Sequence, residues 1–110
     1  MWPPYSLRSS YLSQWINGRE HGENMTQTVY KYPFQIADEV ILGIPSDAQL
    51  LTVQMQNGQP CLWALVDPGN EIERRRLLVR GTGHDAEEIG RYISTFQMHG
   101  GALVFHVFEE

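Results

Sequence analysis

The dipeptide Asn57-Gly58 constrains the fold of this chain more than any other feature. It stands between two apolar-rich stretches that together run from Leu50 to Asp67. A type I′ turn requires a positive φ at both central residues, and Asn-Gly adopts it at the lowest steric cost. With a two-residue loop, Met55 lies opposite Pro60 in a non-hydrogen-bonded pair, so the missing N–H of Pro60 removes no bond within the hairpin. The sequence therefore predicts a β-hairpin here.

Both faces of this hairpin are apolar, which is typical of strands that are covered on both sides. Strict alternation gives one face the residues Leu50, Cys61, Trp63 and Leu65. The other face receives Leu51, Val53, Leu62 and Ala64. We expect cover for both faces, either from the same domain or from a partner, and a homodimer would supply such a partner.

From Thr28 onward, strand-like segments alternate with turn signals. The strongest signal is Asp67-Pro68-Gly69-Asn70, in which Pro presets φ and Gly tolerates a positive φ. Gly100-Gly101 predicts a closing hairpin, and the pair Asp85 and Glu88 predicts a capping box with one short helical turn near residues 85–91. About seven antiparallel strands at roughly ten-residue spacing predict an all-β fold, a meander that forms a small sandwich or a partly open barrel.

The first 24 residues differ from the rest, because they show no sustained period of 2 or 3.6. Codons for Gly22-Glu23 can spell a purine-rich GGAGAA shortly before the ATG of Met25, as in a bacterial ribosome-binding site. We therefore expect Met25 to be the physiological start and residues 1–24 to be untranslated leader read as protein. The alternative is a flexible N-terminal arm. Residues 25–110 are expected to form a single β domain.

Size, cysteine content and charge limit the class of protein. A chain of 110 residues suits one domain with its own core. The single cysteine, Cys61, excludes an internal disulfide and suits a reducing, cytoplasmic setting. A net charge of −5 with scattered acidic residues argues against nucleic-acid binding. No segment reaches the roughly 18 apolar residues of a membrane helix, so we expect no membrane attachment.

The sequence gives no pattern for metal binding or catalysis. Cys61, His84, His99 and His106 are spaced unlike any zinc motif. Cys61 lies in the middle of a predicted strand, where cysteine usually packs as a small hydrophobic residue. The chain has no nucleophile elbow and no phosphate-binding loop of the P-loop type. We therefore predict a non-enzymatic protein without a metal or other cofactor.

Four arginines form the one basic cluster and the first candidate binding surface: Arg74, Arg75, Arg76 and Arg80. In a strand, Arg75 points to the opposite face from the other three. Such a row suits phosphates or an acidic partner surface. The alternative is that charge on an exposed strand blocks edge-to-edge aggregation.

The loop Gly81-Thr82-Gly83-His84 is the second candidate, for an anion or small ligand. Free backbone N–H groups at the start of a helix hold anions, and His84 could assist them. The alternative is that the glycines only reverse the chain before a helical cap.

Four blocks of sequence carry a resemblance to a known family: Val29 to Tyr32, Gln56 to Pro68, Gly81 to His84 and Thr95 to Glu109. Over residues 25–110 the chain resembles a family of small proteins of tailed bacteriophages and prophages, classed as a domain of unknown function. The resemblance implies a single-domain protein that begins where Met25 stands, and it transfers no catalytic residue.

Together these features lead us to expect a phage or prophage accessory protein that acts in the bacterial host cytoplasm. We expect it to bind a host or phage protein, in host takeover or in the inhibition of a defence system. A minor virion or assembly protein that packs as an oligomer is the first alternative. Binding of a small ligand or anion at the Gly81–His84 loop is the second.

Overall fold

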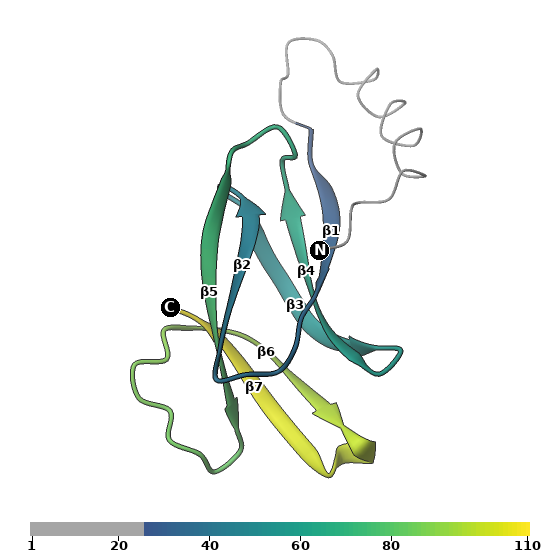
Figure 1. Ribbon diagram of the computed structural model, residues 1–110, viewed down its shortest axis with the longest axis vertical. Coiled ribbons are helices and arrows are strands. Elements are labelled where there is room, and N and C mark those ends of the chain that lie inside the picture. The colour runs from purple at the N-terminus through teal and green to yellow at the C-terminus, as the bar shows by residue number, and fades with distance from the viewer. Residues whose placement is uncertain (1–25) are drawn as a thin grey trace.

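The computed structural model describes residues 26–110, which form seven strands in two antiparallel sheets (Figure 1). Sheet A has the order β1–β4–β3 and consists of β1 (Thr28–Pro33), β4 (Gln59–Val66) and β3 (Gln49–Gln56). Sheet B has the order β2–β5–β7–β6 and consists of β2 (Glu39–Pro45), β5 (Ile72–Gly81), β7 (Leu103–Glu109) and β6 (Arg91–Met98). The expected leader or arm, residues 1–24, lies outside the described residues.

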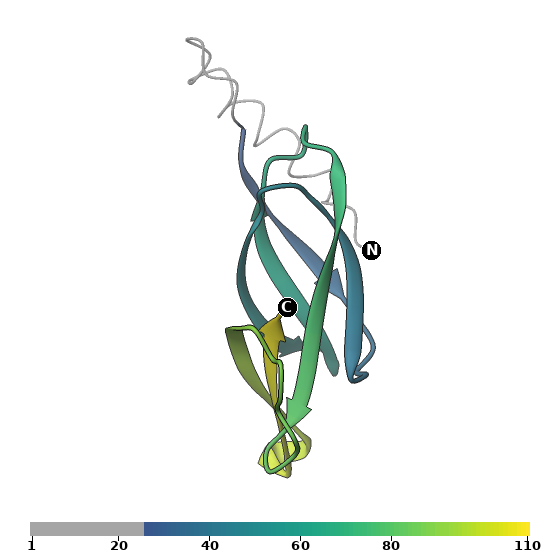
Figure 2. The ribbon, with the colours of Figure 1, turned by 90° about the vertical axis from the view of Figure 1, so that its left-hand side faces the viewer.

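The core lies between the two sheets, which Figure 2 shows from the side. Each strand contributes alternate residues to it, because successive side chains of a strand point to opposite faces. The largest fully buried side chains are Tyr32, Phe96, Ile44, Leu62, Leu77, Val53, Val66 and Val107. The predicted all-β fold with seven antiparallel strands is confirmed. The sheets form a sandwich and do not close into a barrel.

The strand order differs from the expected meander. Within each sheet only β3–β4 and β6–β7 pair as sequence neighbours, whereas β1 pairs with β4 and β2 with β5. The chain changes sheet after β1, after β2 and after β4. The physical reason is burial, since crossing between layers lets the apolar inner faces of successive strands cover one another.

The Asn57-Gly58 hairpin is confirmed, with φ of 51° and 81° at its two central residues. Its register pairs Met55 with Pro60, as predicted. A β-bulge between Leu50 and Thr52, which strict alternation does not predict, changes the faces beyond it. Leu50 is therefore buried in the core and Leu51 is exposed. The sequence predicts the reverse, with Leu50 on the face of Trp63 and Leu51 on the face of Val53.

The missing N–H of Pro60 affects the neighbouring strand rather than the hairpin. The backbone N–H of Phe34, just beyond β1, donates to the Pro60 carbonyl at 3.1 Å. The Phe34 carbonyl accepts a hydrogen bond from the side-chain amide of Gln59 at 3.3 Å. Gln59 thus supplies the donor that proline lacks.

The short helical turn expected near residues 85–91 is wrong. That segment is an irregular loop in which Glu88 and Gly90 have φ of 57° and 74°. Left-handed backbone interrupts the hydrogen-bond pattern of a right-handed helix. Among the described residues the one helical element is the 3₁₀ turn η1 (His99–Gly101), which links β6 to β7.

Candidate functional site

The four arginines of the predicted cluster, hereafter the arginine row, lie on β5 with the expected alternation. Arg75 points inward, where its side chain is only 14% exposed. Its Nε and Nη2 donate to the two carboxylate oxygens of Glu109, and its Nη1 donates to the Ala48 carbonyl at 3.2 Å. Arg91 also reaches Glu109, at 3.1 Å. The side-chain hydrogen bond from Arg75 lowers the pKa of the Glu109 carboxyl, and the same bond raises the pKa of Arg75.

Arg76 points outward and forms ion pairs with Glu39 and Glu110. These two carboxylates already neutralise its charge at the surface. Arg74 is exposed and forms no ion pair with any described residue. The arginine row is therefore not one continuous basic patch, because its members have separate roles.

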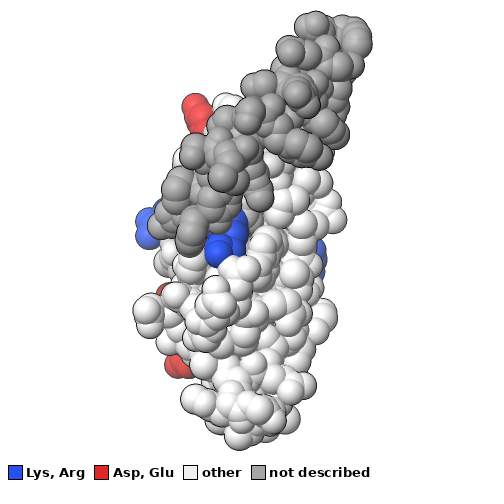
Figure 3. Space-filling view, turned by 90° about the vertical axis from the view of Figure 1, so that its right-hand side faces the viewer, with Lys and Arg blue, Asp and Glu red and all other residues white. Residues whose placement is uncertain are grey.

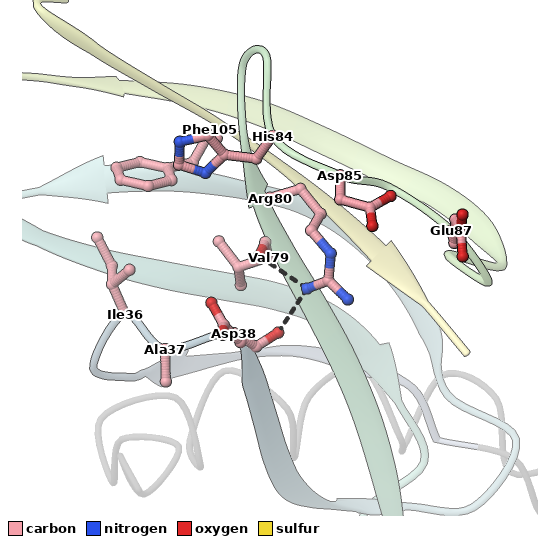
Figure 4. A pocket seen from close by; sticks show the side chains of 10 residues that line it. Ile36, Ala37, Asp38, Val79, Arg80, His84, Asp85, Glu87 and Phe105 are labelled. Carbon is pink, nitrogen blue, oxygen red and sulfur yellow. Dashed lines mark hydrogen bonds between the residues drawn. The ribbon is translucent and has the colours of Figure 1, made fainter.

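A cleft of about 570 Å³ brings the end of the arginine row together with the predicted loop (Figure 4). We call it the Arg80 cleft. Its lining comes from the β1–β2 connection, the end of β5, the loop that follows β5, and β7. The lining residues are Ile36, Ala37, Asp38, Val79, Arg80, Gly81, His84, Asp85, Glu87 and Phe105. Arg80 and part of the loop, which are separate candidates in the sequence, thus belong to one site.

Arg80 is held in this cleft by backbone carbonyls and not by a carboxylate. Its Nη1 donates to the carbonyls of Asp38 and Val79, both at 3.0 Å. No described carboxylate forms an ion pair with it. A guanidinium offers five N–H donors, so the Arg80 side chain keeps further donors for a ligand.

The Gly81–His84 loop contributes differently from the expectation. The N–H of Thr82 donates to the Val104 carbonyl at 3.2 Å, and the N–H of His84 donates to the Gly81 carbonyl at 3.0 Å. These backbone donors are therefore used within the chain and do not form a cradle for an anion. Gly81 and His84 line the cleft, whereas Thr82 and Gly83 do not.

Thr82 instead belongs to a chain of hydrogen bonds on the outer face of sheet B. His106 lies between two threonines, with Nε2 2.7 Å from Thr82 Oγ1 and Nδ1 3.0 Å from Thr95 Oγ1. The hydroxyl of Tyr92 continues the chain, 2.8 Å from Thr95 Oγ1. His106 thus bonds its cross-strand neighbour Thr95, and the chain ties the loop after β5 to β6 and β7.

Sheet A has an outer face that is nearly free of charge. Lys31 is the single charged residue in β1, β3 and β4 together. The outward side chains are those that alternate with the core residues, namely Val29, Lys31, Leu51, Thr52, Gln54, Gln56, Cys61, Trp63 and Leu65. We call this set the sheet A outer face. Figure 3 looks onto this side of the molecule, where uncharged residues dominate the described surface.

Cys61 is buried on this sheet, and burial raises the pKa of its thiol. Its Sγ contacts the Gln59 carbonyl at 3.5 Å. Within residues 26–110, no group of three or more His, Cys, Asp or Glu side chains is placed to hold a metal ion. In the same residues, no helix is long and apolar enough to span a membrane.

The fold and these surfaces define a small β-sandwich domain. Residues 25–110 match a family described as a domain of unknown function, DUF7352. The match covers most of the chain, which therefore belongs to that family. Searches of curated proteins and of solved structures gave no match.

Proposed function

We propose that the protein is a non-enzymatic accessory protein of a bacteriophage or prophage that binds another protein in the host cytoplasm. The binding surface is the sheet A outer face. One observation carries this proposal. On the sheet A outer face, Val29 and Leu51 are exposed, and Trp63 and Leu65 are half-buried. Lys31 is the only charged residue of the three strands.

The composition of this face matches the centre of a protein interface. Such centres are depleted in charged residues, and tryptophan is among the residues that contribute most binding energy. A face with one charged residue disfavours a strongly charged partner, because most of the partner's charges would lose their hydration without gaining opposite ones. The partner surface is therefore expected to be apolar and uncharged as well.

The arginine row is a weaker candidate for this role. Arg75 and Arg76 already form ion pairs with carboxylates of the same chain, so an acidic partner would have to displace them. Arg80 is part of a cleft and donates to two carbonyls. Within the arginine row, Arg74 alone is exposed and forms no ion pair with a described residue.

Affinity capture of the full chain from host cells, with identification of the captured protein, tests the proposal. Val29→Asp and Leu51→Asp place charge on the face at positions that are 39% and 41% exposed, so both variants should fold. We expect each to lose the captured protein. Ile72→Asp, at a position on sheet B that is 63% exposed, is the matched control and should retain it. Capture that survives both face variants but is lost with Arg74→Glu would assign the interface to the arginine row.

A second function, that of a virion or assembly protein, would use the same face for self-association. The observation in its favour is again the lack of charge, because two copies of a charged face repel one another. Light scattering on purified protein and mass spectrometry of purified particles test it. A monomer at high concentration that is absent from particles contradicts this second function.

A further inference from the structure

We propose that the Arg80 cleft binds a free α-amino acid with an apolar or aromatic side chain. This inference is independent of the protein-binding function, since the cleft and the sheet A outer face share no residue. It follows from three features of the cleft, which match the carboxylate, the ammonium group and the side chain of such a ligand.

The first feature is the guanidinium of Arg80. Two backbone carbonyls fix its Nη1, and no described carboxylate forms an ion pair with it. Anchoring by neutral carbonyls fixes the orientation of the guanidinium plane and leaves its positive charge intact. The remaining N–H groups suit the two oxygens of a ligand carboxylate, which arginine binds in a planar, bidentate way.

The second feature is an excess of negative charge around Arg80. Asp38, Asp85 and Glu87 line the same cleft, so three carboxylates accompany one guanidinium. Figure 4 shows Asp38 and Asp85 on different sides of the Arg80 side chain. A simple anion would be repelled by these carboxylates, whereas a ligand that also carries an ammonium group would be attracted to them.

The third feature is an apolar wall beside the charged groups. Ile36, Val79 and Phe105 line it, as Figure 4 shows. Val79 is buried and Phe105 is half-buried, so the wall is part of the packed sandwich. The cleft volume of about 570 Å³ lies within the range of small-molecule sites, roughly 300–1,000 Å³. An amino-acid side chain against this wall removes apolar surface from water.

Titration of the full chain with three related compounds tests the proposal by heteronuclear NMR or calorimetry. L-phenylalanine carries both charges, 3-phenylpropionate lacks the ammonium group, and phenethylamine lacks the carboxylate. We expect L-phenylalanine to bind and each analogue to bind about tenfold more weakly or worse, because each leaves one set of charged partners unused. Absence of L-phenylalanine binding at millimolar concentration overturns the proposal, and so does an analogue that binds as tightly.

Two sets of variants locate the binding. Arg80→Gln should abolish it, and Arg74→Gln, an exposed arginine on the same strand outside the cleft, should leave it unchanged. If Arg80→Gln does not fold, the double change Asp85→Asn with Glu87→Gln decides, because both residues are exposed on a loop. This double variant should bind L-phenylalanine about tenfold more weakly than the natural chain does. Its affinity for L-phenylalanine should then be close to that of the natural chain for 3-phenylpropionate. An unchanged affinity would show that binding occurs elsewhere.

Discussion

At the scale of the residue, adjacent arginines on one strand have different physical roles. Arg74 points to solvent and Arg75 points to the edge of the core, where its guanidinium forms a bidentate pair with Glu109. Both side chains of this pair are mostly buried, at 14% and 12% exposure. A bidentate pair shielded from water is stronger than a surface ion pair, and the loss of one partner leaves the other charge without compensation.

Replacement of Arg75 should therefore destabilise the protein far more than replacement of Arg74. We expect Arg75→Met to lower the free energy of unfolding by about 2 kcal/mol, the cost of losing hydrogen bonds to a charged group. Arg74→Met should change it by no more than about 0.5 kcal/mol, as is usual at exposed positions. Urea denaturation of both variants measures the difference. Equal effects would show that the pair with Glu109 does not stabilise the fold.

The same pair predicts a dependence of stability on pH. Because the hydrogen bond from Arg75 lowers the pKa of Glu109 below its ordinary value of 4.5, the folded state binds this proton less readily than the unfolded state. The stabilisation is therefore fully present above pH 4.5 and is lost as pH falls through the lower pKa of the folded state. Glu109→Gln should be less stable than the natural chain at neutral pH, and this gap should narrow under acid. Urea midpoints measured across that range test it, and a constant gap would contradict it.

Tyr32 gives the opposite case, a buried polar atom without a partner among the described residues. Its side chain is 1% exposed and its hydroxyl has no hydrogen bond, while burial raises its pKa to about 12. A buried hydroxyl without a partner costs free energy. We expect Tyr32→Phe to leave stability unchanged or to raise it by up to about 1 kcal/mol. A loss of stability in urea denaturation would mean that the hydroxyl is hydrogen-bonded, for example to a buried water molecule.

Alternation along a strand is a local property, and it correctly predicts that Arg75 points away from the other arginines. It did not identify Glu109 as the partner. The two residues are 34 positions apart, and only the pairing of β5 with β7 brings them together. The proximity of Arg80 and His84 is likewise not predictable from the sequence, since the cleft that joins them depends on the β1–β2 connection.

At the scale of the element, the two hairpins are predictable because two or three adjacent residues specify each turn. The register of the closing hairpin, with Phe96 opposite Phe105, follows from Gly100-Gly101 in the same way. The helical turn near residues 85–91 was wrong because a capping box describes only the start of a helix. No helical turn starts here, because Glu88 already has a positive φ and Gly90 lies against the backbone of Glu109.

Gly90 is therefore the residue of this loop that should tolerate change least. A Cβ there would lie 2.2 Å from the Glu109 carbonyl oxygen, and its φ of 74° already disfavours a side chain. We expect Gly90→Ala to lower the free energy of unfolding by about 2 kcal/mol or more. Gly83→Ala is the matched control, because Gly83 has a φ of 88° but no atom within 4 Å of an added Cβ. In Gly83→Ala, backbone strain alone should lower the free energy of unfolding by about 1 kcal/mol. Thermal unfolding should show that Gly90→Ala is less stable than Gly83→Ala. The opposite order would show that Gly90 does not lie in close contact with the Glu109 backbone.

At the scale of the whole molecule, charge is divided between the sheets. Sheet A has one charged residue, whereas sheet B carries the arginine row and the carboxylates that pair with it. This division cannot be predicted from the sequence, because β2 lies between β1 and β3 along the chain but belongs to the other sheet. Periodicity indicated which residues share a face of a strand, and it could not indicate which strands share a layer.

The two sheets are joined along one side by side-chain hydrogen bonds between the edge strands β3 and β6. Ser94 on β6 is 5% exposed, and its Oγ donates to the Val53 carbonyl at 2.9 Å and lies 3.0 Å from Thr52 Oγ1. We expect Ser94→Ala to lower the free energy of unfolding by about 2 kcal/mol, because the buried Val53 carbonyl loses its donor. Thr95→Val, on the opposite face of β6, should cost no more than about 1 kcal/mol, as for a partly exposed hydrogen bond.

Hydrogen exchange distinguishes this role of Ser94 from ordinary local packing. If the hydrogen bonds of Ser94 hold the layers together, their loss should speed exchange at backbone amides of β3 in sheet A and of β6 in sheet B to a similar extent. A residue that only packed within its own strand would affect β6 and its partner β7 and leave β3 protected. Protection that falls in β6 and β7 alone would show that the sheets are held by the apolar core without this contact. The sandwich would then depend on the burial of its inner faces, the same property that drives the chain to cross between layers.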